Sequence, residues 1–371
     1  MIQIYSNSLG EEELNAVKEV FDSKWLGKGP KTNQFVEDIS NKINKPSKFM
    51  TTTTCCTEGI FQIMDLLNIK KGDEVILPSI SFVGVANAIV YKNATPVFCD
   101  VDKHTLNPTV EDIEKKITTK TKVLIVIHYA GVPCDIDNIV KLCKKNNIIL
   151  IEDNANSPFS KYKKQNTGTF GDFGVWSFDA MKILVTGDGG LIYSENEEYI
   201  DKLNKLSYLG LETSSGLSSD IDKKWWQFEV SVPGRRSITN DITSAIGIEQ
   251  LKKVDGFIRR RKEIHNIYNS ELDGTDWVIT PTIKDEVDSS YYMYHIQLKE
   301  RDELARHLRS NDVYTTFRYY PLHWVDFYNS KEKLPNTDYV AKSTLCLPLH
   351  QNLTDDDVDY IIKTIKKFKG V

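Results

Sequence analysis

Residues 123–127 read V-L-I-V-I, an uninterrupted apolar run in the first half of the chain. A strand with one wet face would alternate apolar and polar residues, so a run that is apolar on both faces predicts a strand covered by helices on both sides. Segments with helical spacing, such as residues 136–143, separate this run from similar ones. The similar runs are residues 73–78, 96–101, 122–129 (which contains the quoted run), 147–153, 173–178 and 189–193. This alternation predicts an α/β fold, a three-layer α/β/α unit around a mostly parallel sheet.

The length of 371 residues predicts two domains, because a domain commonly holds roughly 100–200 residues. A long helical pattern begins at a plausible cap, Asn240 or Asp241, and runs to about residue 269. A strand at 292–298 and a helix at 300–310 follow it. We therefore expect a large domain at 1–254 and a smaller C-terminal α+β domain at 255–371. Residues 212–226, rich in Ser, Gly and Asp, are expected to form a mobile loop.

The bulk properties exclude several classes of protein. The formal net charge is −5, whereas a nucleic-acid-binding protein normally carries a basic excess. No apolar run approaches the roughly 20 residues that span a bilayer, and no signal peptide is visible at the first residues. The six cysteines show neither a C-x-x-C pair nor a disulfide or metal-ligand spacing. We therefore expect a cytoplasmic protein with no metal site and no partnership with membranes or nucleic acids.

Polar groups with chemical potential follow the predicted strands. In open α/β sheets, ligands bind beyond the carboxyl ends of the strands. Asp153 and Ser177 each close a strand, and Lys182 follows shortly before the glycine-rich residues 186–190. Pyridoxal 5′-phosphate (PLP) requires a carboxylate at its pyridine nitrogen and a lysine that forms a Schiff base and moves a proton. A glycine-rich turn beside the lysine allows close backbone approach.

The segment that holds these groups resembles a known signature. It reads I-E-D-N-A-N-S at 151–157 and G-T-F-G-D-F-G-V-W-S-F-D-A-M-K-I-L-V-T-G-D-G-G at 168–190. This is similar to the core of the nucleotide-sugar aminotransferases of the DegT/DnrJ type, which are PLP enzymes with the aspartate aminotransferase fold, fold type I. The resemblance extends along nearly the whole chain. Its further landmarks are residues 25–31, 72–79, 96–102, 244–251 and 320–323.

The resemblance implies a role for each matching residue. Lys182 would form the Schiff base and act as the proton-shuttling base, and Asp153 would pair with the pyridine nitrogen. Phe82 would stack on the ring of the cofactor. Thr57 and Glu58 open a helix, where backbone N–H groups and a hydroxyl can hold the phosphate.

Other matches are less complete. Ser177 would add a second hydroxyl to the phosphate, and Arg236 falls where the partner subunit commonly supplies a phosphate contact. Asn156 stands where the family commonly has a longer glutamine that contacts the cofactor, and Cys56 stands where it commonly has glycine. His323 would approach the substrate, although a structural histidine is almost as plausible there.

The resemblance implies a transamination. L-Glutamate would convert PLP to pyridoxamine 5′-phosphate (PMP), and a nucleotide-linked keto sugar, most commonly a 4-keto-6-deoxy hexose, would receive the amine. A homodimer with shared active sites and a place in deoxyamino sugar and polysaccharide biosynthesis are implied in the same way. Two alternatives remain: a PMP-dependent sugar dehydratase, in which histidine replaces the lysine found here at Lys182, and a non-catalytic regulatory protein on the same fold. A nicotinamide-dependent oxidoreductase is disfavoured because no G-x-G-x-x-G follows a strand.

Overall fold

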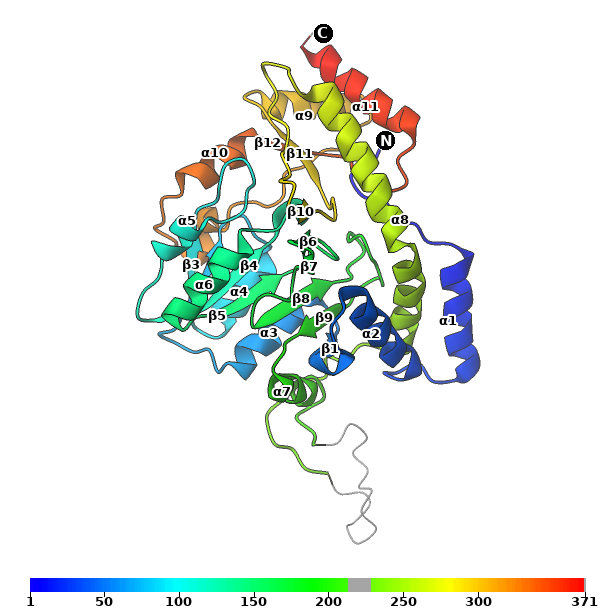
Figure 1. Cartoon of the computed structure of the whole chain (residues 1–371), viewed down its shortest axis with the longest axis vertical. Coiled ribbons are helices and arrows are strands. Elements are labelled where there is room, and N and C mark those ends of the chain that lie inside the picture. Colours follow the sequence, from blue (N-terminus) through cyan, green and yellow to red (C-terminus); the bar gives the residue numbers. More distant parts are fainter. Residues whose placement is uncertain (213–227, 370–371) are drawn as a thin grey trace.

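The computed structural model describes residues 1–212 and 228–369, so most of the loop expected at 212–226 lies outside the described residues. Its centre is a seven-stranded sheet in the order β1-β9-β8-β5-β4-β2-β3 (Figure 1). Only β9 runs against the other six strands, so the predicted mostly parallel sheet is confirmed. The strands are β1 (Met50–Thr53), β2 (Glu74–Pro78), β3 (Thr95–Cys99), β4 (Thr121–Ile127), β5 (Ile149–Asp153), β8 (Phe173–Ser177) and β9 (Gly190–Tyr193).

Strand β4 shows why the sheet lies between helices. Val123 and Ile125 point into an apolar cluster formed with helices α3, α4 and α7. Leu124 and Val126, on the opposite face, pack against α5 and α6. Because both faces of the strand are buried, each residue of the V-L-I-V-I run removes apolar area from water. These helices are α3 (Cys56–Leu66), α4 (Val83–Tyr91), α5 (Val110–Glu114), α6 (Ile136–Asn146) and α7 (Glu197–Ser207).

Helices α2 (Pro30–Ile43) and α8 (Asp241–Leu272) cover the other half of the α5/α6 face of the sheet. Phe35 of α2 and Ile248 of α8 belong to one apolar cluster with Trp176 of β8. Gly247 makes this contact possible, since a Cβ atom there would lie 2.6 Å from the Phe35 ring. Helix α1 (Glu11–Ser23) packs on the outer side of α8, as Figure 1 shows. The three-layer arrangement is thereby complete.

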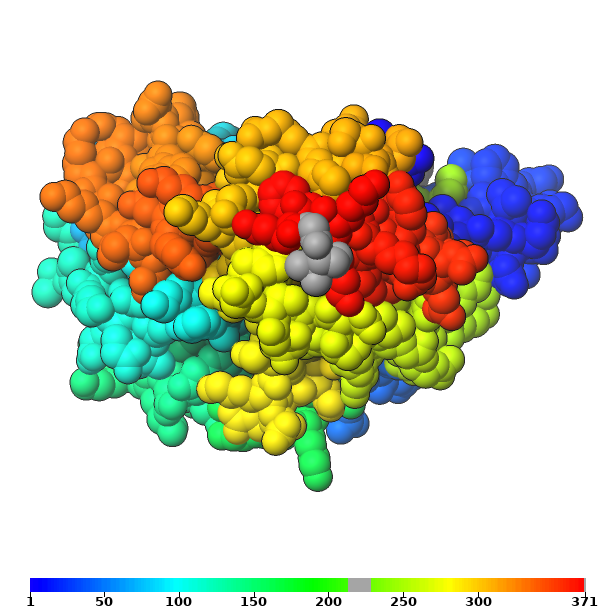
Figure 2. Space-filling model, turned by 90° about the horizontal axis from the view of Figure 1, so that it is seen from above, coloured from blue at the N-terminus to red at the C-terminus, as the bar shows by residue number. Residues whose placement is uncertain are grey.

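The C-terminal segment forms a separate apolar core with the second half of α8. Figure 2 shows this part from above, with α11 lying against α8. It contains β11 (Tyr294–Gln297), paired antiparallel with β12 (Thr344–Leu347), and helices α9 (Arg301–Ser310), α10 (Pro335–Ser343) and α11 (Asp355–Phe368). Asn240 caps α8 through its side chain, as predicted. Helix α8 runs without a break through residue 255, so the boundary expected there stays a prediction.

The remaining elements are short. A small sheet joins β10 (Val287–Asp288), β6 (Lys161–Tyr162) and β7 (Gln165–Asn166), so it links the C-terminal segment to the loop after β5. The 3₁₀ turns are η1 (Ser47–Phe49), η2 (Tyr129–Gly131), η3 (Leu322–Trp324) and η4 (Asp326–Tyr328). Within residues 1–212 and 228–369, no helix is both long and apolar enough to cross a bilayer.

Candidate active site

The predicted strand-end carboxylate lies at the carboxyl edge of the sheet. Asp153 is the last residue of β5, and its side chain is buried. The Ala155 N–H donates to Asp153 Oδ1 at 3.0 Å, and Cys56 Sγ lies 3.9 Å from the same oxygen. Burial raises the pKa of Asp153 above its ordinary value, although the Ala155 N–H and Lys182 act to lower it. The Ala155 N–H and Cys56 Sγ thus both contact Oδ1 of Asp153.

Glu152, the residue before Asp153, anchors the end of β5. Its fully buried carboxylate accepts three backbone N–H groups from residues 168–171 at 2.7–2.8 Å. His128 Nδ1 accepts the Cys134 N–H, so His128 Nε2 carries the hydrogen and donates it to Glu152 at 3.0 Å. A buried carboxylate requires such complete hydrogen bonding. The end of β5, and with it Asp153, is therefore firmly held.

Lys182 lies in the loop after β8, half-buried beside an aromatic ring. Its Nζ atom is 4.9 Å from the centroid of Tyr292, which is fully buried and whose N–H donates to the Ala130 carbonyl oxygen at 3.1 Å. Burial acts to lower the pKa of Lys182, but Tyr292, Tyr319 and Asp153 outweigh it and the pKa is raised. The surroundings of the amine therefore favour its protonated form.

A second tyrosine joins two of the predicted residues. Asn156 Nδ2 donates to the hydroxyl of Tyr319 at 3.2 Å, and Asn156 Oδ1 is buried with no partner among the described residues. The Phe82 ring meets Tyr319 edge to face, with centroids 6.1 Å apart. Phe82 keeps 46% of its surface exposed, although the preceding Ser81 is buried. An exposed aromatic face at this position is available for stacking.

Helix α3 points its N-terminus at the same region. Gly84 permits the approach, because a Cβ atom there would lie 2.9 Å from Thr57 Oγ1 and 3.0 Å from the Phe82 ring. Gly190 of β9 also allows the N-terminus of α3 to lie close, since a Cβ atom at this position would lie 2.7–2.8 Å from the backbone of Cys55 and Cys56. A helix N-terminus attracts anions through its free N–H groups and its dipole.

Glu58 belongs to this first turn but directs its side chain elsewhere. The Glu58 N–H donates to Cys55 Sγ at 3.4 Å, which caps the helix. The Glu58 carboxylate accepts a hydrogen bond from Arg235 Nε at 3.0 Å. A contact between Glu58 and a phosphate therefore stays a prediction.

Three other predicted residues make contacts of their own. The Arg236 guanidinium lies over the ring of Tyr208, 5.0 Å from its centroid. Ser177 Oγ accepts the Asp179 N–H at 3.4 Å. Both ring nitrogens of His323 are engaged, Nδ1 with Ser79 Oγ at 2.7 Å and Nε2 with Asp338 Oδ1 at 3.1 Å. This engagement favours a structural role for His323, and burial lowers its pKa.

The residues at this edge fit PLP. The site offers a lysine amine, a buried carboxylate, an exposed aromatic face and a helix N-terminus, and these are the groups the cofactor requires. The buried and unpartnered Asn156 Oδ1 marks a polar contact that a bound group would complete. Sequence reasoning did not single out Tyr292 or Tyr319. The aromatic run at 317–320 was the available signal for Tyr319, and nothing local distinguishes Tyr292 from a core residue.

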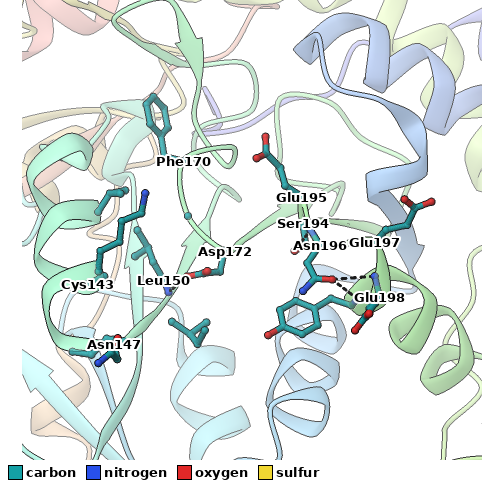
Figure 3. A pocket seen from close by; sticks show the side chains of 16 residues that line it. Cys143, Asn147, Leu150, Phe170, Asp172, Ser194, Glu195, Asn196, Glu197 and Glu198 are labelled. Atoms are coloured by element: carbon teal, nitrogen blue, oxygen red, sulfur yellow. Dashed lines mark hydrogen bonds between the residues drawn. The ribbon is translucent and has the colours of Figure 1, made fainter.

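A pocket of about 1030 Å³ lies at the opposite edge of the sheet (Figure 3). It opens at the start of β5 and β8, where Asp172 Oδ2 accepts the Leu150 N–H at 2.8 Å. Its acidic residues Glu195 and Glu197 pair with Lys45 and Lys48. Its lining includes none of the predicted site residues.

Comparisons with known proteins agree with this geometry. Residues 7–366 match the model of the DegT/DnrJ/EryC1/StrS aminotransferase family. The chain is 41% identical, over 99% of its length and 96% of the relative, to dTDP-4-dehydro-2,3,6-trideoxy-D-glucose 4-aminotransferase from Saccharopolyspora spinosa. Among solved structures, aminotransferase TlmJ from Streptoalloteichus hindustanus superposes with a TM-score of 0.95 at 45% identity, covering 100% of this chain and 99% of TlmJ.

A further neighbour bears on the cofactor. Spr1654 from Streptococcus pneumoniae has been solved in a PLP form and a PMP form. Both superpose with a TM-score of 0.91, at 26–27% identity, and cover 99% of this chain and 97–98% of Spr1654. PLP, with PMP as the second form, is the cofactor that these relationships assign to the site.

Proposed function

The chain belongs to the DegT/DnrJ/EryC1/StrS aminotransferase family, and on that premise we propose that it transfers the amino group of L-glutamate to a nucleotide-linked 4-keto-6-deoxy hexose. The coarser activity, that of a PLP-dependent sugar aminotransferase acting on a nucleotide sugar, follows from the family and the relatives. The choice of carbon 4 as the carbon that receives the amine is supported by the Saccharopolyspora relative. The name of that relative gives a 4-dehydro sugar that is deoxygenated at carbon 6.

The observation that carries the proposal is that Lys182 and the buried Asp153 lie at the carboxyl edge of the sheet, where each influences the pKa of the other. PLP, when bound, supplies an electron sink for amino-group transfer. Lys182 would hold the cofactor, and its Nζ atom would carry a proton between the two carbon atoms that flank the transferred nitrogen. Asp153, whose Oδ1 already accepts the Ala155 N–H, would use Oδ2 to hold the proton on the pyridine nitrogen. Phe82 would stack on one face of the ring.

The phosphate and the ring hydroxyl would be held by neighbouring groups. Thr57 and the first N–H groups of α3, Glu58 among them, form the proposed phosphate site, with Ser177 beside it. Asn156 would complete its hydrogen bonding at the ring hydroxyl with the support of Tyr319, to which it already donates. This arrangement would offset the methylene by which Asn156 is shorter than glutamine.

We also propose that the working unit is a homodimer with shared sites. Several large apolar side chains are exposed in the single chain, among them Trp25, Phe82, Met181, Tyr320 and Phe327. Exposed apolar surface of this kind is characteristic of protein interfaces. Arg236 would reach the phosphate of the neighbouring site from the partner.

All six cysteines are free, in keeping with a cytoplasmic location.

An absorbance experiment tests the proposal. The purified protein with PLP is expected to show a visible band that moves to shorter wavelength when L-glutamate is added. Lys182→Ala should lack the band, whereas Lys45→Ala, which removes a surface lysine paired with Glu195, should retain it. Nucleotide-linked 4-keto-6-deoxy hexoses should then restore the band in the glutamate-treated enzyme. A protein that gains no lysine-dependent band would instead support the regulatory alternative, and conversion of the sugar without amine transfer would support the dehydratase.

A further inference from the structure

A buried thiol lies against the carboxylate of Asp153. Cys56 is the first residue of helix α3, and its side chain packs in the apolar cluster that α3 shares with β5, β8 and β9. Its Sγ atom is 3.9 Å from Asp153 Oδ1, the length of a weak S–H···O hydrogen bond. The thiol has no other hydrogen-bond partner among the described residues. Helix α3 thus brings a thiol to the end of β5, from a position 97 residues away in the sequence.

The hydrogen of this contact belongs to the sulfur. Burial raises the pKa of the Cys56 thiol well above its usual range, and the nearby Asp153 raises it further. An ionised carboxylate only accepts hydrogen bonds, so the bond runs from the thiol to Oδ1. Cys134, which is also buried, donates in the same way to the carbonyl oxygen of Ile127 at 3.3 Å.

The carboxylate of Asp153 is stabilised by such a donor, because burial opposes its charge. Burial raises the pKa of Asp153, and four groups act in the opposite direction. They are the Ala155 N–H, Lys182 in the loop after β8, His128 at the end of β4 and the Cys56 thiol. A hydrogen bond to the charged form of an acid favours that form. Of the four groups, the Ala155 N–H and the thiol are hydrogen-bonded to the carboxylate.

Both hydrogen bonds end on the same oxygen. The Ala155 N–H reaches Oδ1 at 3.0 Å from the loop after β5, whereas the Cys56 thiol reaches it from α3. Two donors from separate segments resist rotation of the carboxylate about its Cβ–Cγ bond. Oδ2 has no partner in the part of the chain that the structure describes, so it is left for another donor.

We propose that Cys56 is a positioning residue for Asp153, whose carboxylate its S–H group holds by Oδ1 so that Oδ2 faces the pyridine nitrogen of the cofactor. The inference rests on the part given to Asp153 in the proposed function. Cys56 acts through Asp153, because it keeps that carboxylate both ionised and oriented. An alanine at position 56 would lose the donor, whereas a serine would retain one.

The hydrogen bond can be observed in the cofactor-free protein. The S–H stretching band lies in a part of the infrared spectrum where other protein groups absorb little, and its frequency falls when the thiol donates. Subtraction of the Cys56→Ala spectrum isolates the band of Cys56. Removal of the acceptor by Asp153→Ala should move this band to higher frequency. An unmoved band would show that the thiol does not donate to the carboxylate, and would overturn the proposal.

Cys134 provides a matched control for the infrared experiment. Its band, isolated in the same way with Cys134→Ala, should keep its frequency in Asp153→Ala, because its acceptor is a backbone carbonyl oxygen. Asp153→Asn serves as the second variant if Asp153→Ala fails to fold. It keeps an oxygen acceptor but loses the charge, so the Cys56 band should move in the same direction by a smaller amount.

The effect on Asp153 can be measured by titration of its carboxyl group. In carbon NMR spectra of the cofactor-free protein, Asp153→Asn identifies the resonance. Cys56→Ala should raise the pKa of Asp153, because a donor to its charged form is lost while Lys182 and His128 remain. Cys56→Ser should leave the pKa closer to that of the unmodified protein. The same pKa in all three proteins would contradict the proposed role.

Retention of PLP gives a further readout. Cys56→Ala should raise the apparent dissociation constant of PLP about 3- to 10-fold, the range for loss of one hydrogen bond. The loss should grow as the pH falls, because Asp153 takes up its proton at a higher pH in this variant. Cys56→Ser should bind PLP nearly as the unmodified protein does, and Cys134→Ala should not differ from it. Equal weakening by Cys56→Ala and Cys56→Ser at every pH would assign Cys56 to packing alone and refute the proposal.

The infrared and titration experiments are independent of the proposed reaction. A protein that binds PLP but does not react with glutamate would contradict the proposed amino donor alone. The role of Cys56 would still be supported by a shifted S–H band and a raised Asp153 pKa, and would be overturned without them.

Discussion

The Nζ atom of Lys182 lies 4.9 Å from the centroid of the Tyr292 ring, and that ring is fully buried. The negative face of an aromatic ring attracts a cation, more strongly when both are withdrawn from water. The pKa of Lys182 is raised, because charge interactions with Tyr292, Tyr319 and Asp153 outweigh the burial that alone would lower it. The surroundings of Lys182 thus favour the protonated form of its amine.

Replacement of Tyr292 by leucine is expected to lower the pKa of Lys182 in the cofactor-free protein. The neutral amine is the form that captures PLP, so the pH profile of the capture rate should move to lower pH. Tyr292→Phe keeps the ring and should move the profile less. Stopped-flow absorbance at a series of pH values measures both variants. An unshifted profile for Tyr292→Leu would show that the ring does not hold the charge.

Asp153→Asn is expected to reduce the rate of the glutamate half-reaction by at least about 100-fold, in the range of a lost charged interaction at a reacting centre. The amide cannot hold the proton of the pyridine nitrogen, and it is close to the carboxylate in size. Single-turnover absorbance measures the rate, and the chromophore confirms that cofactor is bound. As a control, Asp172→Asn alters a carboxylate at the opposite edge of the sheet, where it accepts the Leu150 N–H. Its rate should be unchanged.

Gly190→Ala should loosen the N-terminus of α3. The new methyl would lie 2.7–2.8 Å from the backbone of Cys55 and Cys56, so one of the two segments must move. We expect a loss of about 1–3 kcal/mol in the free energy of unfolding and weaker retention of PLP on dialysis. Gly256→Ala is the control, because in α8 its methyl meets nothing nearer than 3.9 Å. It should stabilise the protein by about 0.5–1 kcal/mol.

Asp241→Ala should destabilise the fold through helix α2. The Asp241 carboxylate accepts the N–H groups of Gly29, Lys31 and Thr32 at 2.8–3.2 Å, so it caps α2 from the first turn of α8. Loss of a cap and exposure of unmet donors should cost about 1–3 kcal/mol in urea denaturation. Asn240→Ala, which removes the cap of α8, should cost about 1 kcal/mol. A smaller loss in the free energy of unfolding for Asp241→Ala than for Asn240→Ala would contradict this account.

The protein should lose stability as the pH falls from about 6.5 to about 4. Burial lowers the pKa of His265, His295 and His350 to about 4, against about 6.5 in an unfolded chain. Between pH 4 and pH 6.5 the unfolded chain binds more protons than the folded protein, so acid favours unfolding. The stability that these neutral histidines contribute is fully present above about pH 6.5 and is lost as the pH falls towards 4. Urea midpoints at pH 7 and pH 5 measure the effect. His265 packs against Tyr291 and Tyr294, and His265→Phe should reduce the difference between the urea midpoints at the two pH values.

Much of the fold follows from local pattern. The runs that overlap β2, β3, β4, β5, β8 and β9 are recognisable because each is apolar and is bounded by helical spacing or by turn residues. Strands β1 and β12 were not predicted from the sequence, because the threonines of β1 and the short run at 344–347 show no such pattern. The domain boundary expected at residue 255 stays a prediction, since helix α8 continues through that residue.

The sequence by itself determined the layered fold, the strand-end position of Asp153 and the lysine that follows β8, because these depend on periodicity and on order along the chain. The tertiary structure alone decided which side chains meet at that lysine. Tyr292 comes from the C-terminal segment, and Tyr319 joins Asn156 across 163 residues. No period in the sequence records such contacts, since they arise only when burial of the separate apolar faces brings the C-terminal segment against the carboxyl edge of the sheet.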